Sequence, residues 1–118
     1  MAGEPIQRIE KNERLSRVVI HQGVVYLSGL TADDTSQDTA GQTAQILEKA
    51  DAFLATAGTG KSRLLSAQIW LNNIGDFSLM NKAWIDWVDK NNPPARATVE
   101  AKLALPDIKV EIQFTAAV

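Results

Sequence analysis

The segment from Ala95 to Leu103 constrains the fold most strongly, because its side chains alternate strictly in character. Small or apolar residues alternate with polar residues along the segment: Ala95, Ala97, Val99, Ala101 and Leu103 alternate with Arg96, Thr98, Glu100 and Lys102. A repeat of two is typical of a β-strand with one buried and one polar face. We therefore expect a strand whose polar face carries Arg96, opposite a buried face of small residues.

Other segments repeat the period of two. Residues 109–118 alternate over the whole closing stretch, with Val110, Ile112, Phe114, Ala116 and Val118 against Lys109, Glu111, Gln113 and Thr115. Residues 65–71 alternate with Leu65, Ala67, Ile69 and Leu71 on one side. The β-rich runs 18–20 and 24–27 flank Gly23, which predicts an N-terminal hairpin.

Two segments have helical periodicity instead. In the first, steps of three and four join Ile46, Leu47, Ala50, Phe53, Leu54 and Ala57. We expect that helix to begin near Thr39, with Gln42 completing a capping box, and to end at Gly58 and Gly60. The second stripe contains Phe77, Met80, Trp84, Trp87 and Val88. Asp76 is its expected N-cap and residues 91–93 its expected stop.

The order strand, strand, helix, strand, helix, strand, strand predicts an α+β fold, in which two helices cover one face of a mixed sheet. The short connection 104–108 predicts that the last two strands form an antiparallel hairpin. In that register Arg96 and Gln113 face one pocket.

A chain of 118 residues fits one domain, residues 1–118. The net charge of −2 and the absence of a basic stripe argue against nucleic acid as a partner. The chain has no cysteine, and its N-terminal residues lack the apolar core of a signal peptide, so we expect a cytoplasmic protein that does not enter a membrane. We expect no metal site, because the single histidine, His21, has no partners that would complete one.

Arg96 has two interpretations from the residues alone. A guanidinium presents a planar donor fork that matches a carboxylate, so Arg96 fits a binding site for an anionic ligand. It also fits a surface strand position paired with an acidic neighbour. For Glu100 and Glu111 we favour an ion-pair network with Arg96 and Lys109 over an acid-base role.

Three segments together resemble the RidA family, also called YjgF or L-PSP endoribonuclease proteins, and most closely its YoaB-like subgroup. They are residues 24–29 (VVYLSG), 76–81 (DFSLMN) and 94–99 (PARATV), and the closing run from Lys109 to Val118 completes the likeness. The resemblance covers nearly the whole chain. It implies a chorismate-mutase-like domain that forms homotrimers with clefts between subunits. It also implies hydrolysis of reactive 2-imino acids, and of enamines such as 2-aminoacrylate, to 2-oxo acids and ammonia without a cofactor.

Carried over by position, the resemblance assigns roles to seven residues. Arg96 is implied to bind the substrate carboxylate, with the backbone of Thr98 beside it. Ser28 and Gly29 are implied to line the pocket, and Phe77 and Asn81 to face the cleft. Gln113 stands where we expect the hydrolytic members to have a water-activating Glu, and an amide orients water but cannot accept its proton.

Because Gln113 stands in place of that Glu, we consider two functions from different classes. The first is an imine deaminase in which Arg96 and Gln113 suffice. The second is a non-catalytic binder of small 2-oxo or 2-imino carboxylates. The third function is an endoribonuclease, and the net negative charge of the chain argues against it.

Overall fold

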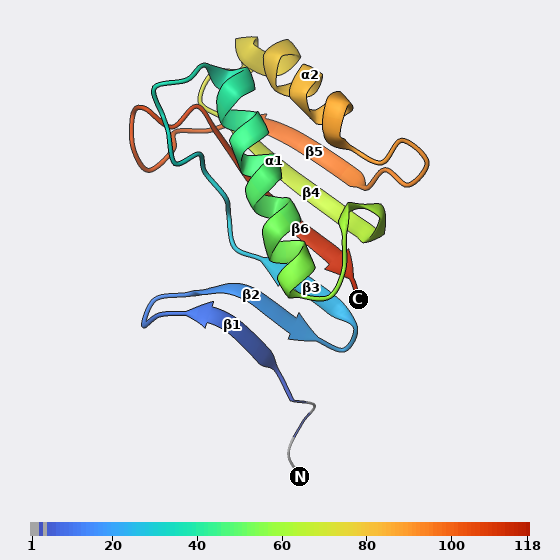
Figure 1. The fold of residues 1–118 in the computed structure, drawn as a ribbon. Coiled ribbons are helices and arrows are strands. Elements are labelled where there is room, and N and C mark those ends of the chain that lie inside the picture. The colour runs from blue at the N-terminus through green and yellow to red at the C-terminus, as the bar shows by residue number, and fades with distance from the viewer. Residues whose placement is uncertain (1–2, 4) are drawn as a thin grey trace.

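The computed structural model describes residues 3 and 5–118, which form a six-stranded sheet covered on one side by two helices (Figure 1). The elements in chain order are β1 (Gln7–Lys11), β2 (Ser16–His21), β3 (Val24–Leu27), α1 (Thr39–Thr56), β4 (Leu64–Leu71), α2 (Phe77–Trp87), β5 (Ala95–Glu100) and β6 (Val110–Ala117). Short 3₁₀ turns precede β4 and α2. The sheet order is β1-β2-β3-β6-β4-β5, and only β4 and β5 run parallel. The predicted α+β class is confirmed.

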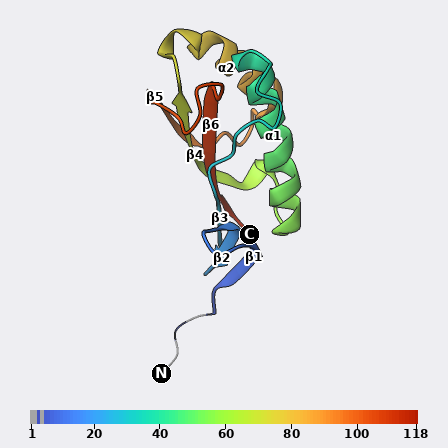
Figure 2. The same ribbon diagram turned by 90° about the vertical axis from the view of Figure 1, so that its left-hand side faces the viewer.

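The core lies between the sheet and the helices, which Figure 2 shows on the same side. The predicted stripe of α1 faces it, with Ile46, Leu47, Ala50 and Leu54 buried. On α2 the buried side chains are Met80 and Trp84, and Trp84 stacks on Phe114 of β6. In the described part of the chain, the opposite face of the sheet carries no helix. None of the described helices has the length and hydrophobicity to cross a membrane.

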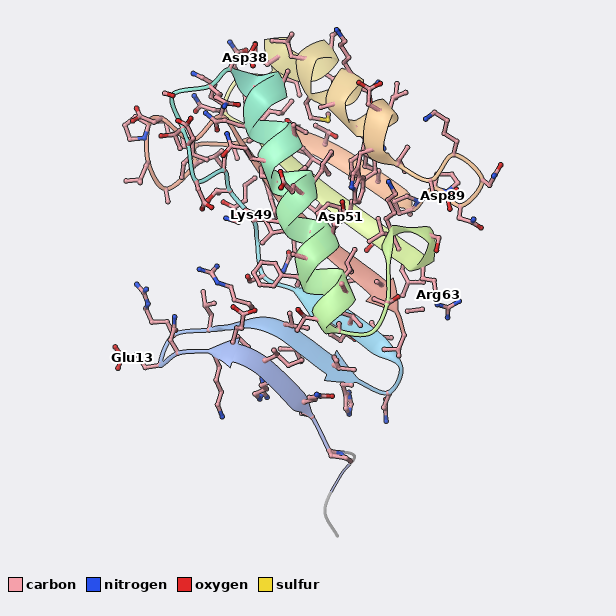
Figure 3. The ribbon with its side chains drawn as sticks, in the orientation of Figure 1. Glu13, Asp38, Lys49, Asp51, Arg63 and Asp89 are labelled. Atoms are coloured by element: carbon pink, nitrogen blue, oxygen red, sulfur yellow. The ribbon has the colours of Figure 1, made fainter. Side chains whose placement is uncertain are left out.

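The first turn of α1 is capped differently from the prediction. Asp38, at the start of the helix in Figure 3, is the N-cap, and its Oδ1 accepts a hydrogen bond from the Gly41 amide at 2.9 Å. Thr39 instead donates its hydroxyl proton to Asp76 at 2.7 Å. Asp76 does precede α2, as expected, but makes no side-chain cap bond there. The predicted capping box between Thr39 and Gln42 is therefore wrong, and the carboxylate one residue earlier replaces it.

The side chain of Gln42 does not form the predicted capping box and instead joins three segments of the chain. Its side chain is fully buried. Nε2 donates to the carbonyl oxygens of Thr35, Gln37 and Asp107 at 3.0–3.1 Å. Oε1 accepts from the Lys109 amide at 2.9 Å. The amide of Gln42 thus fastens the loop before α1 and the loop before β6 to the helix.

The predicted N-terminal hairpin is confirmed and has an additional strand before it. Gln22 and Gly23 both have positive φ, +51° and +79°, as a tight two-residue turn between twisted strands requires. This strand, β1, was not predicted, and it pairs with β2 at the edge of the sheet. Four of its five residues are polar, and only Ile9 packs against the core, so its sequence has no strand signal.

The predicted hairpin of the last two strands is wrong. β6 pairs with β3 on one side and with β4 on the other, so β4 separates it from β5. The longest alternating strand is thereby placed in the middle of the sheet, where its apolar face is fully buried. β4 also begins with a register shift, which buries Leu64 and leaves Leu65 47% exposed.

The faces of β5 are the reverse of the prediction. Arg96 pairs beside Ala67 and Thr98 beside Ile69, and these two partners lie in the core under the helices. Arg96 therefore points to the helix side, while Val99 lies on the open face and is 46% exposed. Because β5 is an edge strand, only part of its helix side is covered, and long polar side chains can reach water around the edge.

Candidate functional site

Arg96 is held by α2 at the free edge of the sheet. Its Nη1 donates to Oδ1 of Asn81 at 2.7 Å. The guanidinium lies over the rings of Phe77, at 5.6 Å, and Trp84, at 5.3 Å. Contacts of a guanidinium with aromatic faces are favourable and fix its plane. One amide bond uses one of the five N–H groups of Arg96, so the others remain available to a ligand.

No carboxylate within the described part of the chain is in ion-pairing distance of Arg96, since the single salt bridge found there joins Lys49 and Asp33. Glu100, four residues further along β5, accepts from the Ile74 amide at 3.0 Å. The ion-pair network expected of Glu100 and Glu111 is therefore wrong. Partial burial lowers the pKa of Arg96, but a guanidinium keeps its charge at neutral pH. Arg96 is a partly exposed, oriented cation without a counter-ion among the described residues.

Among the described residues, two buried hydroxyls have no hydrogen-bond partner, and both belong to predicted site residues. Thr98 Oγ1 lies on the helix side of β5, two residues from Arg96. Ser28 Oγ lies just after β3. Most buried polar atoms in proteins are paired, so an unpaired one is often completed by a ligand, a water or another chain.

A second group of predicted residues lies on the open face of the sheet. Gln113 pairs beside Gln68, away from the helices, and its Nε2 approaches the Leu27 carbonyl at 3.4 Å. Ser28 directly follows the last residue of β3 and lies on the same open face. The carboxylate of Glu111 lies directly against Gly29, because a Cβ atom at Gly29 would overlap Oε2 of Glu111. A side chain at position 29 would therefore displace this carboxylate.

The predicted site residues therefore separate into two groups. Arg96, Thr98, Phe77 and Asn81 belong to the helix side of the β5 edge. Ser28, Gly29 and Gln113 belong to the open face near β3 and β6. The expectation that Arg96 and Gln113 face one pocket of the same chain is wrong, because the hairpin that would bring them together does not form.

Two residues were missed as members of these groups. Glu111 places its carboxylate against Gly29. Its position two residues before Gln113 puts it on the same face, which the alternation already indicated. Trp84 was assigned to the core, and it also supports Arg96. No sequence signal reveals that contact, because it depends on the edge position of β5.

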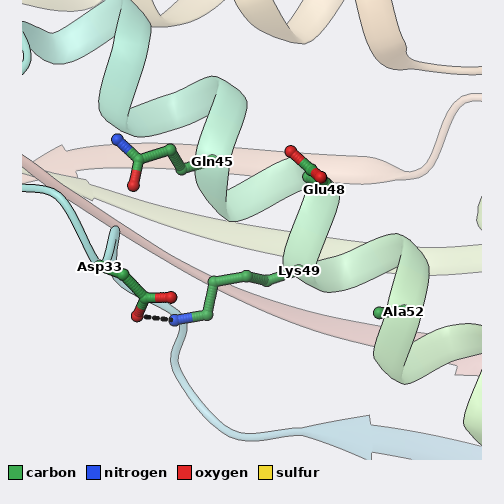
Figure 4. A pocket seen from close by; sticks show the side chains of 5 residues that line it. All are labelled: Asp33, Gln45, Glu48, Lys49 and Ala52. Carbon is green, nitrogen blue, oxygen red and sulfur yellow. Dashed lines mark hydrogen bonds and ion pairs between the residues drawn. The ribbon is translucent and has the colours of Figure 1, made fainter.

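A separate hollow lies between α1 and the loop before it (Figure 4). Lys49 bonds to Asp33 at 3.0 Å and to the Thr31 carbonyl at 2.8 Å, and Gln45 bonds to the backbone of Asp34. These contacts pair Lys49 and Gln45 with the loop, so both side chains fasten the loop to α1. Within residues 3 and 5–118 no cluster of side chains suits a metal ion.

Comparisons with known proteins agree on one family. The family model described as Endoribonuclease L-PSP matches residues 5–118. A RutC family protein of Haemophilus ducreyi is 46% identical over 113 residues, 96% of this chain and 97% of that protein. The RutC family protein YoaB of Escherichia coli is 43% identical over 113 residues, 96% and 98% of the two chains.

Solved structures extend the likeness to three dimensions. NMB1025, a member of the YjgF protein family from Neisseria meningitidis, has a TM-score of 0.94 at 38% identity, covering 97% of this chain and 95% of that one. YyfA of Yersinia pestis, described as a protein of unknown function of the conserved Rid family, has a TM-score of 0.87 at 29% identity, covering 97% and 100%. The chain therefore belongs to the endoribonuclease L-PSP family, the RutC, YjgF and Rid proteins that its sequence resembles.

Proposed function

We propose that this protein is an enamine/imine deaminase that hydrolyses reactive 2-imino acids to 2-oxo acids and ammonia, acting as a homotrimer. The observation that carries the proposal is the state of Arg96, a partly desolvated cation without an internal carboxylate partner. Asn81 and two aromatic rings fix its plane. A planar cation held in this way is preorganised for a carboxylate, the group that all 2-imino acids share.

Binding the carboxylate leaves the electrophilic carbon next to it free for water. Water adds to C2 of the protonated imine and gives a carbinolamine. Loss of the nitrogen as ammonia then gives the 2-oxo acid. The addition requires a group that orients the water and accepts its proton, and such help is worth about 10²–10⁴ in rate. The amide of Gln113 can orient the water but cannot accept its proton, whereas the carboxylate of Glu111 can do both.

The two residue groups act on one substrate only if two subunits meet. Arg96 and its supports occupy one face of the sheet edge, and Glu111 with Ser28 and Gly29 occupies the other face. In a ring of three chains the free β5 edge of one subunit would lie against the open face of the next. The unpaired Ser28 and Thr98 hydroxyls support a cleft that a single chain leaves incomplete.

The activity is tested by generating 2-imino acids in place with an amino acid oxidase and trapping the remaining imine. Wild type is expected to speed imine loss, and Arg96→Ala to abolish the effect. Arg63→Ala is the matched control, since Arg63 is exposed and bonds only to the Val118 carbonyl. Unchanged imine decay with wild type, or acceleration that survives Arg96→Ala, would refute the proposal.

The composite cleft has its own test by subunit mixing. Arg96→Ala and Glu111→Gln are each expected to be inactive alone. Random reassembly of equal amounts gives about a quarter of the clefts with both native residues, and so about a quarter of wild-type activity. A mixture that stays inactive, or light scattering that shows a monomer, would contradict the shared cleft.

A second candidate is a non-catalytic binder of small 2-oxo or 2-imino carboxylates. It is favoured by one observation, the neutral amide of Gln113 on the face opposite Arg96. The two candidates separate in a single comparison. Carboxylate binding that depends on Arg96, without imine hydrolysis by wild type and with hydrolysis by Gln113→Glu, identifies the binder. Cleavage of RNA that persists in Arg96→Ala would instead favour the endoribonuclease.

A further inference from the structure

The outer flank of α2 carries a hollow that the hydrolytic steps do not use. It measures about 330 Å³, within the range of pockets that hold small ligands. Its lining residues are Phe77, Ser78, Asn81, Lys82, Ile85 and Asp86. Phe77 and Asn81 also hold the guanidinium of Arg96. The hollow therefore begins where the proposed carboxylate site ends.

Two apolar side chains, Phe77 and Ile85, line the hollow, with the amide of Asn81 between them. Phe77, Asn81 and Ile85 follow each other at intervals of four, so they lie on one flank of the helix. Phe77 is 37% exposed and Ile85 is 48% exposed. Eight residues of helix span about 12 Å, which is enough for the side chain of a leucine- or phenylalanine-sized acid.

Charge is arranged to match a ligand with one anionic end. Arg96 lies beside Phe77 and Asn81 at the edge of the hollow, without a carboxylate partner in the described residues. Lys82 and Asp86 are opposite charges on the outer rim, so that rim has no net charge of its own. A carboxylate with an uncharged, apolar tail fits this order of groups.

Two other hollows fit such a ligand less well. The hollow beside Lys49 is polar, and its cation is already paired with Asp33 (Figure 4). A hollow between β4 and β5 includes Arg96 among its residues. The other residues that line this hollow include Gln68, which lies on the open face of the sheet. The Arg96 guanidinium lies on the opposite face, against α2. Of these three hollows, the one on α2 shares Phe77 and Asn81 with the groups that hold the cation.

We propose that this hollow is the side-chain subsite of the acid whose carboxylate binds Arg96, and that it selects 2-imino acids with apolar side chains of three or more carbons. The inference rests on the proposed function. The tail of the ligand lies over Phe77 and extends to Ile85. Ile85 is then a specificity-determining residue with no part in carboxylate binding or in water addition.

The test measures binding of two 2-oxo acids, 2-oxobutanoate and 2-oxo-4-methylpentanoate, by titration calorimetry. The second has two more side-chain carbons, and burial of one methylene is worth about fourfold in affinity. Because the hollow is open on one side, we expect wild type to bind the longer acid about tenfold more tightly. Ile85→Ser is expected to remove most of that preference and to leave 2-oxobutanoate binding unchanged.

Leu79→Ser is the matched control, because Leu79 is 41% exposed on α2 but does not line the hollow. It is expected to keep the preference. Equal affinity of wild type for both acids, a preference that survives Ile85→Ser, or its loss in Leu79→Ser would overturn the subsite. Absence of binding to either acid, or binding that survives Arg96→Ala, would overturn the proposed function as well. Binding of 2-oxobutanoate through Arg96 without a preference for the longer acid would overturn the subsite alone.

Discussion

Replacing Gln42 by Leu is expected to destabilise the fold strongly, although Gln42 lies far from the candidate site. Leucine has a similar size and a good helix propensity, so the substitution removes the polar amide with little change in shape. The two N–H groups of Nε2 are shared among three carbonyl oxygens, and Oε1 accepts one amide. The change therefore removes the equivalent of three hydrogen bonds.

The size of the effect follows from burial. Each hydrogen bond contributes about 1 kcal/mol net, and a donor or acceptor left buried and unpaired costs about 1–3 kcal/mol. Gln42 is fully buried, so water cannot take its place at the Lys109 amide without a cavity. The carbonyls of Gln37 and Asp107 belong to exposed residues and can recover water. We expect a loss of about 3 kcal/mol, a large fraction of the 5–15 kcal/mol that holds a typical domain together.

The assay is urea unfolding of Gln42→Leu, with Gln45→Leu as the matched control. Gln45 is the same residue type on the same helix and also makes two bonds to a loop, but it is only half-buried. Water can replace its bonds, so we expect less than about 1 kcal/mol there. An unchanged slope of the transition would show that the change is in stability. Equal losses in the two variants, or a loss below about 1 kcal/mol for Gln42→Leu, would refute the reasoning.

Three further predictions concern the site and the pH dependence. Asn81→Asp puts a carboxylate 2.7 Å from Arg96 Nη1, so it should compete with the ligand and weaken 2-oxo acid binding about tenfold or more in calorimetry, while Asn81→Ala should weaken it less. Gly29→Ala would displace the carboxylate packed against it, so we expect slower imine hydrolysis with Arg96-dependent binding retained; hydrolysis at the wild-type rate would contradict a need for the carboxylate at this position. A hydrogen bond from Asn92 holds the pKa of Asp89 below its ordinary 3.8, so this contribution to stability is present above pH 3.8 and is lost as the pH falls through the lowered value. Asp89→Asn should therefore flatten the urea midpoint between pH 5 and pH 2 relative to wild type, and an identical acid dependence would contradict this.

The sequence by itself determined most of the elements and where they begin and end. The apolar stripes around Leu54 and Trp84 predicted both helices, because a repeat of 3.6 is imposed by the backbone of each helix alone. Gly23 marked the hairpin turn and Gly58, with φ of +79°, the end of α1. The one missing element, β1, is a polar edge strand that forms only because β2 is beside it. Local chemistry decides local structure when few long-range contacts compete with it.

The site residues were also found locally, but their arrangement was not. Arg96 was recognised as a cation that a ligand could use, and the structure adds that Asn81 and Trp84 orient it. A period of two says that neighbours alternate between faces, but it does not say which face is covered. For β5 the covered face was predicted wrongly, since small residues such as Ala97 occupy the open side.

Only the tertiary structure decided which strands are neighbours. β6 lies between β3 and β4, since its apolar side, including Ile112 and Phe114, is completely buried only in the centre of the sheet. That single choice separates Arg96 from Gln113 and Glu111 by the thickness of the sheet. Strand order depends on contacts between residues far apart in the chain, whose energies no local pattern contains. The sequence determined which groups could do chemistry, and the packing of the sheet decided which of them can meet within one chain.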